Sequence, residues 1–317
     1  MSHGLKDNSI LDEQKRLAAR KQALWLRSRM SHAIRQFFIE RDYLEVETPH
    51  LIPAPPPEVH IDVISAGDLF LQTSPELYMK RLLSAGFDGI FQICRCFRQG
   101  ERGRLHLPEF TRLEWYRTGL DYKDRMEECE ELISHLTLSL DSATGIGFQG
   151  KRISLERPWE KITVTQAFND YASMPLKDAL ENGCFDEILV KEIEPCLGIT
   201  RPTFLYDYPA SMGALARVKP DDPRFAERFE IYMGGIELAN GFSELTDGQE
   251  QRRRFERDEK KRRLMGGRPY PMPEKFLRFL EQMPEAAGIA MGIDRLAMIF
   301  SDAEKIDDVV PFTPEDL

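Results

Sequence analysis

The segment 109–117 limits what this chain can fold into more than any other stretch of its sequence. A strand over these residues would alternate its side chains between two faces. One of those faces would carry Phe110, Arg112, Glu114 and Tyr116. An exposed face has no need of two aromatic rings, and a buried core face does not accept an unpaired arginine and glutamate. The pattern therefore predicts a strand that lines a polar site. The alternative is a half-solvated face with an Arg–Glu pair.

A second strand is expected at residues 90–98, joined to the first by the loop 99–108. Arg98 ends this strand, and its planar guanidinium suits a phosphate because it can hold two oxygens at once. The charged loop by itself also fits a solvated hairpin connection. Cys94 and Cys96 have no second closely spaced pair of cysteines in the chain. Their spacing therefore favours a structural role over a metal site.

The rest of the chain mixes helices and strands. Periodicity and turn residues predict helices at 11–40, 75–85, 122–140, 247–265 and from 295, and strands at 43–49, 59–63, 70–73, 204–208, 225–233, 236–239 and 288–293. Antiparallel strands with helices appended, rather than repeated βαβ units, predict an α+β fold. We expect one domain over residues 1–317, with the weakly patterned residues 142–200 as a helical insertion.

The first predicted helix carries an apolar stripe at helical spacing, made of Leu26, Met30, Ala33, Ile34, Phe37 and Phe38. Such a stripe suits either the core of the chain or an interface with a second copy. Residues 53–57 include four prolines and must form an extended loop.

Gly234 and Gly235 predict a two-residue turn between two strands. Tyr232 would then pair with Glu237, and Glu230 would share their face of the hairpin. Two carboxylates this close repel unless a cation lies between them. Mg²⁺ held by one or two carboxylates and nucleotide phosphates fits that arrangement. An exposed ribbon, with each acid paired to a nearby arginine such as Arg228, fits equally well.

The segment 288–296 reads Gly-Ile-Ala-Met-Gly-Ile-Asp-Arg-Leu. Gly288 and Gly292 would let the backbone approach a ligand closely. Arg295 falls at the expected start of a helix, where the backbone also favours anions. Glycines at this spacing are weak evidence alone, and the following Asp-Arg-Leu makes the pattern more specific.

The composition excludes several classes of protein. The chain has 317 residues, with 43 Lys and Arg against 53 Asp and Glu, for a net charge of −10, which disfavours a protein that mainly coats nucleic acid. Five irregularly spaced cysteines do not make a disulfide framework and favour a reducing compartment. No apolar run reaches the ~20 residues of a membrane helix, and residues 1–14 do not read as a targeting peptide. We expect a cytoplasmic protein with no membrane partner.

Together, three of these segments resemble the signature motifs of class II aminoacyl-tRNA synthetases. The long first helix and the strand ending at Pro49 resemble motif 1. The strand ending at Arg98, the charged loop and the strand from Glu109 resemble motif 2, and residues 288–296 resemble motif 3. The motifs lie in the family's order and span residues 16–300. The resemblance implies the antiparallel catalytic domain of that family, flanked by helices.

The finer resemblance is to the lysyl-tRNA synthetase group. Residues 73–82 (TSPELYMKRL), 106–111 (HLPEFT) and 237–247 (ELANGFSELTD) are similar to its active-site segments. That group carries an N-terminal anticodon-binding barrel, whereas residues 1–42 here are predicted to be helical, so we expect no anticodon-binding domain. The chain is most similar to the paralogous family that ligates (R)-β-lysine to a lysine of elongation factor P.

One detail favours the ligase paralogues, and two depart from the family pattern. The ligases share Ala290, where lysyl-tRNA synthetases usually have glycine. An added methyl group in a tight pocket is worth about 1–3 kcal/mol of discrimination and would favour the displaced amine of β-lysine. Gly100 stands where motif 2 usually has glutamate, so Glu101 is expected to take over the adenine contact. Leu107 replaces the asparagine usual at the loop exit.

The resemblance implies a role for each site residue. It assigns catalysis to Arg98 and Arg295, and ATP binding to Arg98, Glu101, His106, Phe110 and Arg295. It assigns the amino-acid substrate to Glu76, Glu114, Tyr116, Asn240, Glu244 and Ala290. It assigns Mg²⁺ to Glu230 and Glu237.

The implied reaction is ATP-dependent activation of (R)-β-lysine as an adenylate, followed by its transfer to a lysine of elongation factor P. One alternative is a truncated lysyl-tRNA synthetase that activates lysine for another acceptor. Another is a non-catalytic paralogue acting as a regulatory subunit, which should have lost its ATP ligands. The motif 1 resemblance also implies a homodimer.

Overall fold

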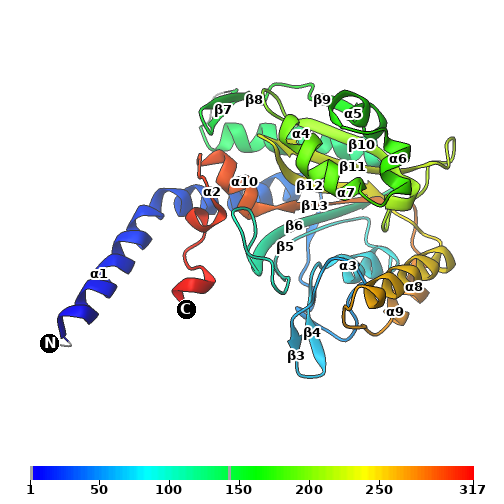
Figure 1. Ribbon diagram of the computed structural model, residues 1–317, viewed down its shortest axis with the longest axis horizontal. Coiled ribbons are helices and arrows are strands. Elements are labelled where there is room, and N and C mark those ends of the chain that lie inside the picture. Colours follow the sequence, from blue (N-terminus) through cyan, green and yellow to red (C-terminus); the bar gives the residue numbers. More distant parts are fainter. Residues whose placement is uncertain (1–2, 142–143) are drawn as a thin grey trace.

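The computed structural model describes residues 3–141 and 144–317 and is organised around one eight-stranded sheet (Figure 1). In spatial order its strands are β1 (Leu44–Glu45), β5 (Gly89–Phe97), β6 (Glu109–Thr118), β13 (Ala286–Gly292), β12 (Ile236–Ser243), β11 (Phe225–Met233), β10 (Thr203–Pro209) and β9 (Glu160–Thr163). All neighbours are antiparallel except the outer pairs β1–β5 and β10–β9. The α+β prediction is confirmed.

Helices pack on both faces of the sheet, whereas α1 (His3–Ala19) projects away from it (Figure 1). The other helices are α2 (Lys21–Ile39), α3 (Glu76–Leu83), α4 (Tyr122–Ser139), α5 (Val164–Tyr171), α6 (Leu176–Glu181), α7 (Phe185–Ile188), α8 (Gly248–Leu264), α9 (Glu274–Leu280) and α10 (Ile293–Phe300). Leu113 and Trp115 of β6 pack with α2, α4 and α10, whereas Tyr116 packs with α3, α8 and α9. The polar face predicted for residues 109–117 therefore lies on the side of α3, α8 and α9 (Figure 1).

The apolar stripe of the first helix belongs to the core. Met30, Ala33, Ile34, Phe37 and Phe38 are buried against α4, α10 and the sheet. The predicted helix 11–40 is two helices, beginning at His3 and interrupted at Arg20. The Arg20 side chain donates to the carbonyl of Pro311 at 2.8 Å and to Asp316 at 3.1 Å. The polar first half has no apolar periodicity, so its start could not be predicted from the sequence.

The strand predicted at residues 59–63 is wrong, although its alternating side chains do turn inward. Val63 is buried, but its backbone N–H donates to the hydroxyl of Tyr270 at 3.0 Å. The carbonyl of Ile61 accepts from Arg262 at 2.9 Å. Distant side chains thus take the hydrogen bonds that a neighbouring strand would make. The proline-rich residues 53–57 form the expected extended loop, flanked by the small sheet of β2 (Leu51–Ile52), β3 (Ser65–Ala66) and β4 (Leu69–Leu71).

The prediction of a helical insertion at 142–200 is wrong for its first part. Residues 142 and 143 lie outside the described residues. The hairpin of β7 (Gly145–Phe148) and β8 (Lys151–Ser154) comes first, and β9 then joins the main sheet. Ile146 and Ile153 pair across the hairpin and are both buried. These strands are four residues long, too short for a period-two pattern to stand out. Short helices follow, as expected. Among the described residues, no helix has the length and apolar character needed to span a bilayer.

Candidate active site

A cavity of about 350 Å³ opens on the polar face of the sheet. Its walls come from the loop after β2, the start of α3, the loop between β5 and β6, and strands β11, β12 and β13. The register sets Ala290 of β13 between Asn240 of β12 and Glu114 of β6. Of the predicted site residues, the following line the cavity: Glu76, Arg98, Glu101, His106, Phe110, Tyr116, Glu230, Glu237, Asn240, Ala290 and Arg295.

Arg98 and Phe110 form one part of the cavity wall. The backbone N–H of Arg98 donates to the carbonyl of Pro108 at 2.8 Å, which closes the charged loop at its base. The guanidinium lies 5.3 Å from the centre of the Phe110 ring and 3.4 Å from Glu101. Its Nε is buried without a hydrogen-bond partner in the part of the chain that the structure describes. An arginine held so loosely is free to bind an anionic ligand.

Arg295 bridges two other parts of the wall. Its guanidinium donates to the carbonyl of Glu237 at 2.7 Å and lies 3.2 Å from the Glu237 carboxylate. It also lies 2.7 Å from Nε2 of His106, on the charged loop. Burial and the nearby arginine lower the pKa of His106. A neutral imidazole can then accept a hydrogen bond from the arginine.

The hairpin has the predicted turn, with Gly234 and Gly235 at φ of 63° and 74°. Tyr232 pairs with Glu237 as expected, and an irregularity after that pair places Glu230 opposite Asn240. Glu230 and Glu237 thus share the cavity wall, and each has an arginine partner. Arg228 donates to Glu230 at 2.7 Å, as the alternative interpretation of the hairpin predicted, and Arg295 is the partner of Glu237.

The two hairpin acids differ in their fit to a metal ion. Tyr208 and Tyr232 both donate to one oxygen of Glu230 at 2.5 Å, and Arg228 donates to the other. Glu230 would have to exchange one of these donors for a cation. The side chain of Glu237 is 35% exposed, and its one ion pair among the described residues is the 3.2 Å contact with Arg295. Within the described residues no three His, Cys, Asp or Glu side chains are grouped to hold a metal alone. Glu230 and Glu237 can therefore hold Mg²⁺ only if nucleotide phosphates supply its remaining ligands.

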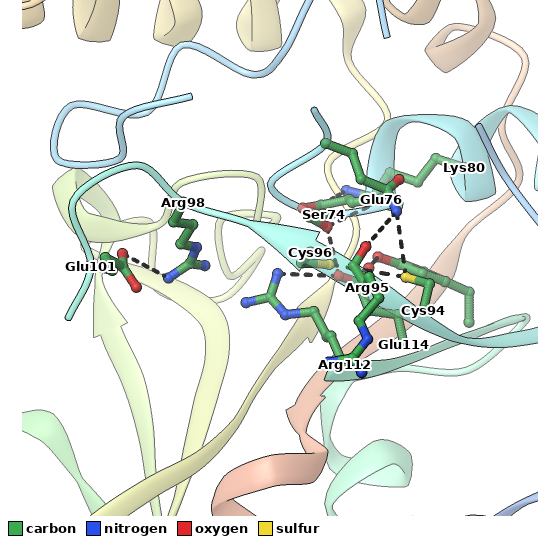
Figure 2. A network of polar contacts seen from close by, with 12 residues as sticks. Ser74, Glu76, Lys80, Cys94, Arg95, Cys96, Arg98, Glu101, Arg112 and Glu114 are labelled. Carbon is green, nitrogen blue, oxygen red and sulfur yellow. Dashed lines mark hydrogen bonds and ion pairs between the residues drawn. The ribbon is translucent and has the colours of Figure 1, made fainter. Parts of the chain in front are cut away.

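Glu76 and Glu114, two of the carboxylates predicted to bind the amino-acid substrate, lie away from Arg98 (Figure 2). Glu114 is 1% exposed and accepts from Ser74 at 2.6 Å, from Tyr116 at 2.8 Å and from Arg112 at 3.2 Å. Glu244 is also 1% exposed and forms an ion pair with Lys80. Glu114 and Glu244 therefore lie behind the residues that line the cavity, and their part in substrate binding stays a prediction.

Lys80 was not predicted as part of the site. It is 1% exposed and also forms an ion pair with Glu76 at 2.6 Å. Lys80 and Glu76 are one helical turn apart on α3, a spacing typical of exposed helix surfaces, so the burial of Lys80 could not be predicted from the sequence. One glycine makes room for this cluster. A Cβ at Gly288 would lie 2.2 Å from the Tyr116 ring and 2.7 Å from Glu244.

A carboxylate from residues 142–200 also contacts the hairpin of β11 and β12. Glu194, in the short 3-10 helix Glu194–Cys196, accepts from the hydroxyl of Tyr232 at 3.3 Å. Burial, Glu237 and Glu230 raise its pKa to about 7. No motif marks Glu194 in the sequence, because only the folded sheet brings it to the hairpin.

The comparisons with known proteins agree with this geometry. The family model for class II tRNA synthetases (D, K and N) matches residues 7–316. The chain belongs to this family. The matched region includes the three segments that resemble the class II motifs and every residue that lines the cavity.

Curated relatives of this class II synthetase domain cover nearly the whole chain. An elongation factor P–(R)-β-lysine ligase from Proteus mirabilis (strain HI4320) is 40% identical over 296 residues, 88% of this chain and 91% of the relative. The same name belongs to a protein of Edwardsiella ictaluri (strain 93-146), 40% identical over 90% of this chain and 93% of the relative. An elongation factor P–(R)-β-lysine ligase from Vibrio atlanticus (strain LGP32) is 40% identical over 93% of this chain and 96% of the relative.

Proposed function

We propose that this chain activates (R)-β-lysine with ATP and ligates it to a lysine of elongation factor P. The observation that carries the proposal is that different parts of the cavity suit ligands of opposite charge. Arg98 and Arg295 suit the anionic phosphates, while Glu76 and the acids behind it suit amines. The names of relatives that match about nine-tenths of the chain specify the amino acid and the acceptor.

The proposed reaction has two steps. First, a carboxylate oxygen of the amino acid attacks the α-phosphorus of ATP, the bond to the β-phosphate oxygen breaks, and pyrophosphate leaves. Arg98 contacts the substrate carboxylate and offsets the charge that develops at the α-phosphate, Arg295 holds the γ-phosphate, and Phe110 stacks on the adenine. His106 and Glu101 lie at the same part of the cavity. The acceptor amine then attacks the adenylate carbonyl and AMP leaves, with a substrate phosphate as a candidate proton acceptor.

Mg²⁺ would neutralise phosphate charge between the nucleotide and the hairpin. Glu237 is the residue best placed to hold it, with Glu230 joining once it releases Arg228 or a tyrosine. Asn240 lies opposite Glu230 in the register and accepts from Arg228 at 3.2 Å. We assign Asn240 to the substrate carboxylate.

The test is mass spectrometry of elongation factor P after incubation with the enzyme, ATP and each lysine isomer. We expect a mass increase of one β-lysyl group with (R)-β-lysine. Parallel reactions with radiolabelled amino acid and tRNA test the nearest alternative, a lysine-activating enzyme with another acceptor. Label on tRNA and none on the factor would refute the proposed acceptor.

A non-catalytic paralogue is disfavoured by the residues of the cavity. Arg98, Phe110, Glu237 and Arg295 are all present and line one cavity. Such a paralogue would show no pyrophosphate exchange with any amino acid, which is the measurement that separates it from an enzyme.

Ala290 offers a test of isomer choice. Its methyl group lies in the cavity wall between Asn240 and Glu114. We expect Ala290→Gly to raise kcat/KM for α-lysine about tenfold in pyrophosphate exchange, since one methyl group is worth about 1–3 kcal/mol. The ratio of kcat/KM for α-lysine to kcat/KM for (R)-β-lysine within each variant cancels differences in the active fraction of the preparations. An unchanged ratio would remove Ala290 from the account of specificity.

Substrate binding should depend on pH through the buried acids. Burial raises the pKa of Glu244 to about 8, and burial also raises the pKa of Glu114. A protonated carboxyl is neutral and attracts an ammonium group weakly, so the KM for (R)-β-lysine should fall as pH rises. We expect a fall of up to about tenfold per pH unit between pH 6 and 8 for one controlling proton. Glu244→Gln should flatten this slope, and a constant KM in the wild type would contradict the assignment.

A homodimer and a cytoplasmic location complete the proposal. The family resemblance supports the dimer, although the apolar stripe of α2 is used within one chain. Analytical ultracentrifugation decides between one copy and two. All five cysteines are free thiols, consistent with the reducing compartment in which a translation factor is modified.

A further inference from the structure

Glu58 also lines the cavity. It directly follows the proline-rich residues 53–57 and lies outside the three motifs. No hydrogen bond or ion pair reaches its carboxylate from the residues that the structure describes. A carboxylate in a cavity wall without a protein partner is available to a ligand.

The loop that carries Glu58 is held in place from two sides. Arg262 of α8, 2% exposed, donates to the carbonyl of Glu58 at 3.1 Å and to that of Ile61 at 2.9 Å. On the other side, the backbone N–H of Gln99 donates to the carbonyl of Asp62 at 2.8 Å. Gln99 directly follows Arg98. The loop is therefore fastened beside the arginine assigned to the α-phosphate and the substrate carboxylate.

The charges around Glu58 favour a cation at this position. Burial raises the pKa of Glu58, Arg98 opposes that rise, and Glu76 adds to it. Arg98 has an anionic substrate to bind and cannot serve Glu58 alone. An ammonium group placed between Glu58 and Glu76 would stabilise both carboxylates in their charged form.

A count of charges leads to the same conclusion. Four carboxylates surround this part of the site: Glu58, Glu76, Glu114 and Glu244. Two cations oppose them, because Lys80 pairs with Glu76 and Glu244 and Arg112 pairs with Glu114. With all four carboxylates ionised and Arg98 bound to the substrate carboxylate, two negative charges remain without a protein cation. A diamino acid brings two ammonium groups to the site.

We infer that Glu58 binds the amine nearer the carboxylate of a diamino acid substrate. The position follows from the loop, since Glu58 is fastened next to Arg98, and Arg98 is the group assigned to the carboxylate. The terminal amine is left to Glu76 and the acids behind it. This inference rests on the proposed function and adds a specificity-determining residue to it.

The experiment measures pyrophosphate exchange by the full chain and by two variants, Glu58→Gln and Glu47→Gln. Glu47 is exposed and lies outside the cavity, so its change is chemically identical and serves as the control. Two constants are compared: the KM for (R)-β-lysine, and the Ki of 6-aminohexanoate as a competitive inhibitor. The inhibitor keeps the carboxylate and the terminal amine but lacks the amine assigned to Glu58.

For Glu58→Gln we expect a rise of at least about tenfold in the KM for (R)-β-lysine, with kcat and the KM for ATP changed less than about threefold. The Ki of 6-aminohexanoate should stay unchanged. A KM within twofold of the wild type, or a Ki that rises in parallel, would overturn the inference, because a merely structural role would weaken both ligands alike. Failure of the proposed function gives a different result, since the wild type would then show no exchange with either lysine isomer.

Discussion

Arg98→Ala is expected to lower kcat/KM for adenylate formation about a thousandfold while leaving the fold intact. Removing one preorganised donor to a developing oxyanion typically costs ~10²–10³ in rate, and Arg98 is also assigned to the substrate carboxylate. Its bonds within the protein are few. The side chain has a 3.4 Å contact to Glu101 and a buried Nε with no partner among the described residues. Little stability is therefore lost when the side chain is removed.

Pyrophosphate exchange measures this effect, and Arg95→Ala supplies the matched control. Arg95 lies on β5, three residues before Arg98, with a side chain 42% exposed and outside the cavity. Its removal should leave exchange within about twofold of the wild type. Arg98→Lys tests the geometry, since lysine keeps the charge but cannot hold two oxygens in the fixed fork of a guanidinium. An Arg98→Ala variant with more than a tenth of the wild-type kcat/KM would contradict the assignment.

The centre of the sheet could be predicted from the sequence because its signals are local. Period two over residues 109–117 separated Arg112 and Glu114 from Leu113 and Trp115, and the structure places the two sets on opposite faces. The Gly234-Gly235 turn fixed the first pairs of the hairpin. Both patterns depend only on neighbours along the chain.

The rest depended on contacts that sequence spacing does not reveal. Residues 59–63 alternate like a strand, yet Arg262 and Tyr270, some 200 positions away, take their backbone groups. Glu58 lies in the same loop and has no motif to mark it. Its place in the site becomes apparent only in the folded structure, where hydrogen bonds hold the loop beside Arg98.

Lys80 is the clearest case of a site residue hidden by a familiar pattern. Lys80 and Glu76 are four residues apart and joined at 2.6 Å, and so are Lys191 and Glu187. The side chain of Lys191 is 68% exposed, whereas that of Lys80 is 1% exposed and also contacts the buried Glu244. The two pairs have the same spacing and the same distance, so burial alone distinguishes them.

The difference in burial between Lys80 and Lys191 predicts a large difference in stability between variants that lose one or the other. Lys80→Met should lower the free energy of unfolding by about 3–5 kcal/mol at pH 9, above the pKa of about 8 of Glu244, because it removes the cation that faces the ionised carboxylate. Lys191→Met removes an exposed pair of the same geometry and should change stability little. Denaturant unfolding of both variants, followed by circular dichroism, makes the comparison.

The double variant Lys80→Met, Glu244→Gln shows whether the loss comes from charge or from packing. With both charges gone, no uncompensated carboxylate remains next to the methionine, so most of the lost stability should return. Binding of a diamine should not return, because the site then lacks one of the four carboxylates that surround it. Recovered stability with a KM for (R)-β-lysine still raised at least about tenfold would separate the two roles of the cluster. A Lys80→Met variant as stable as Lys191→Met would show that Glu244 is held neutral in the folded protein and needs no cation.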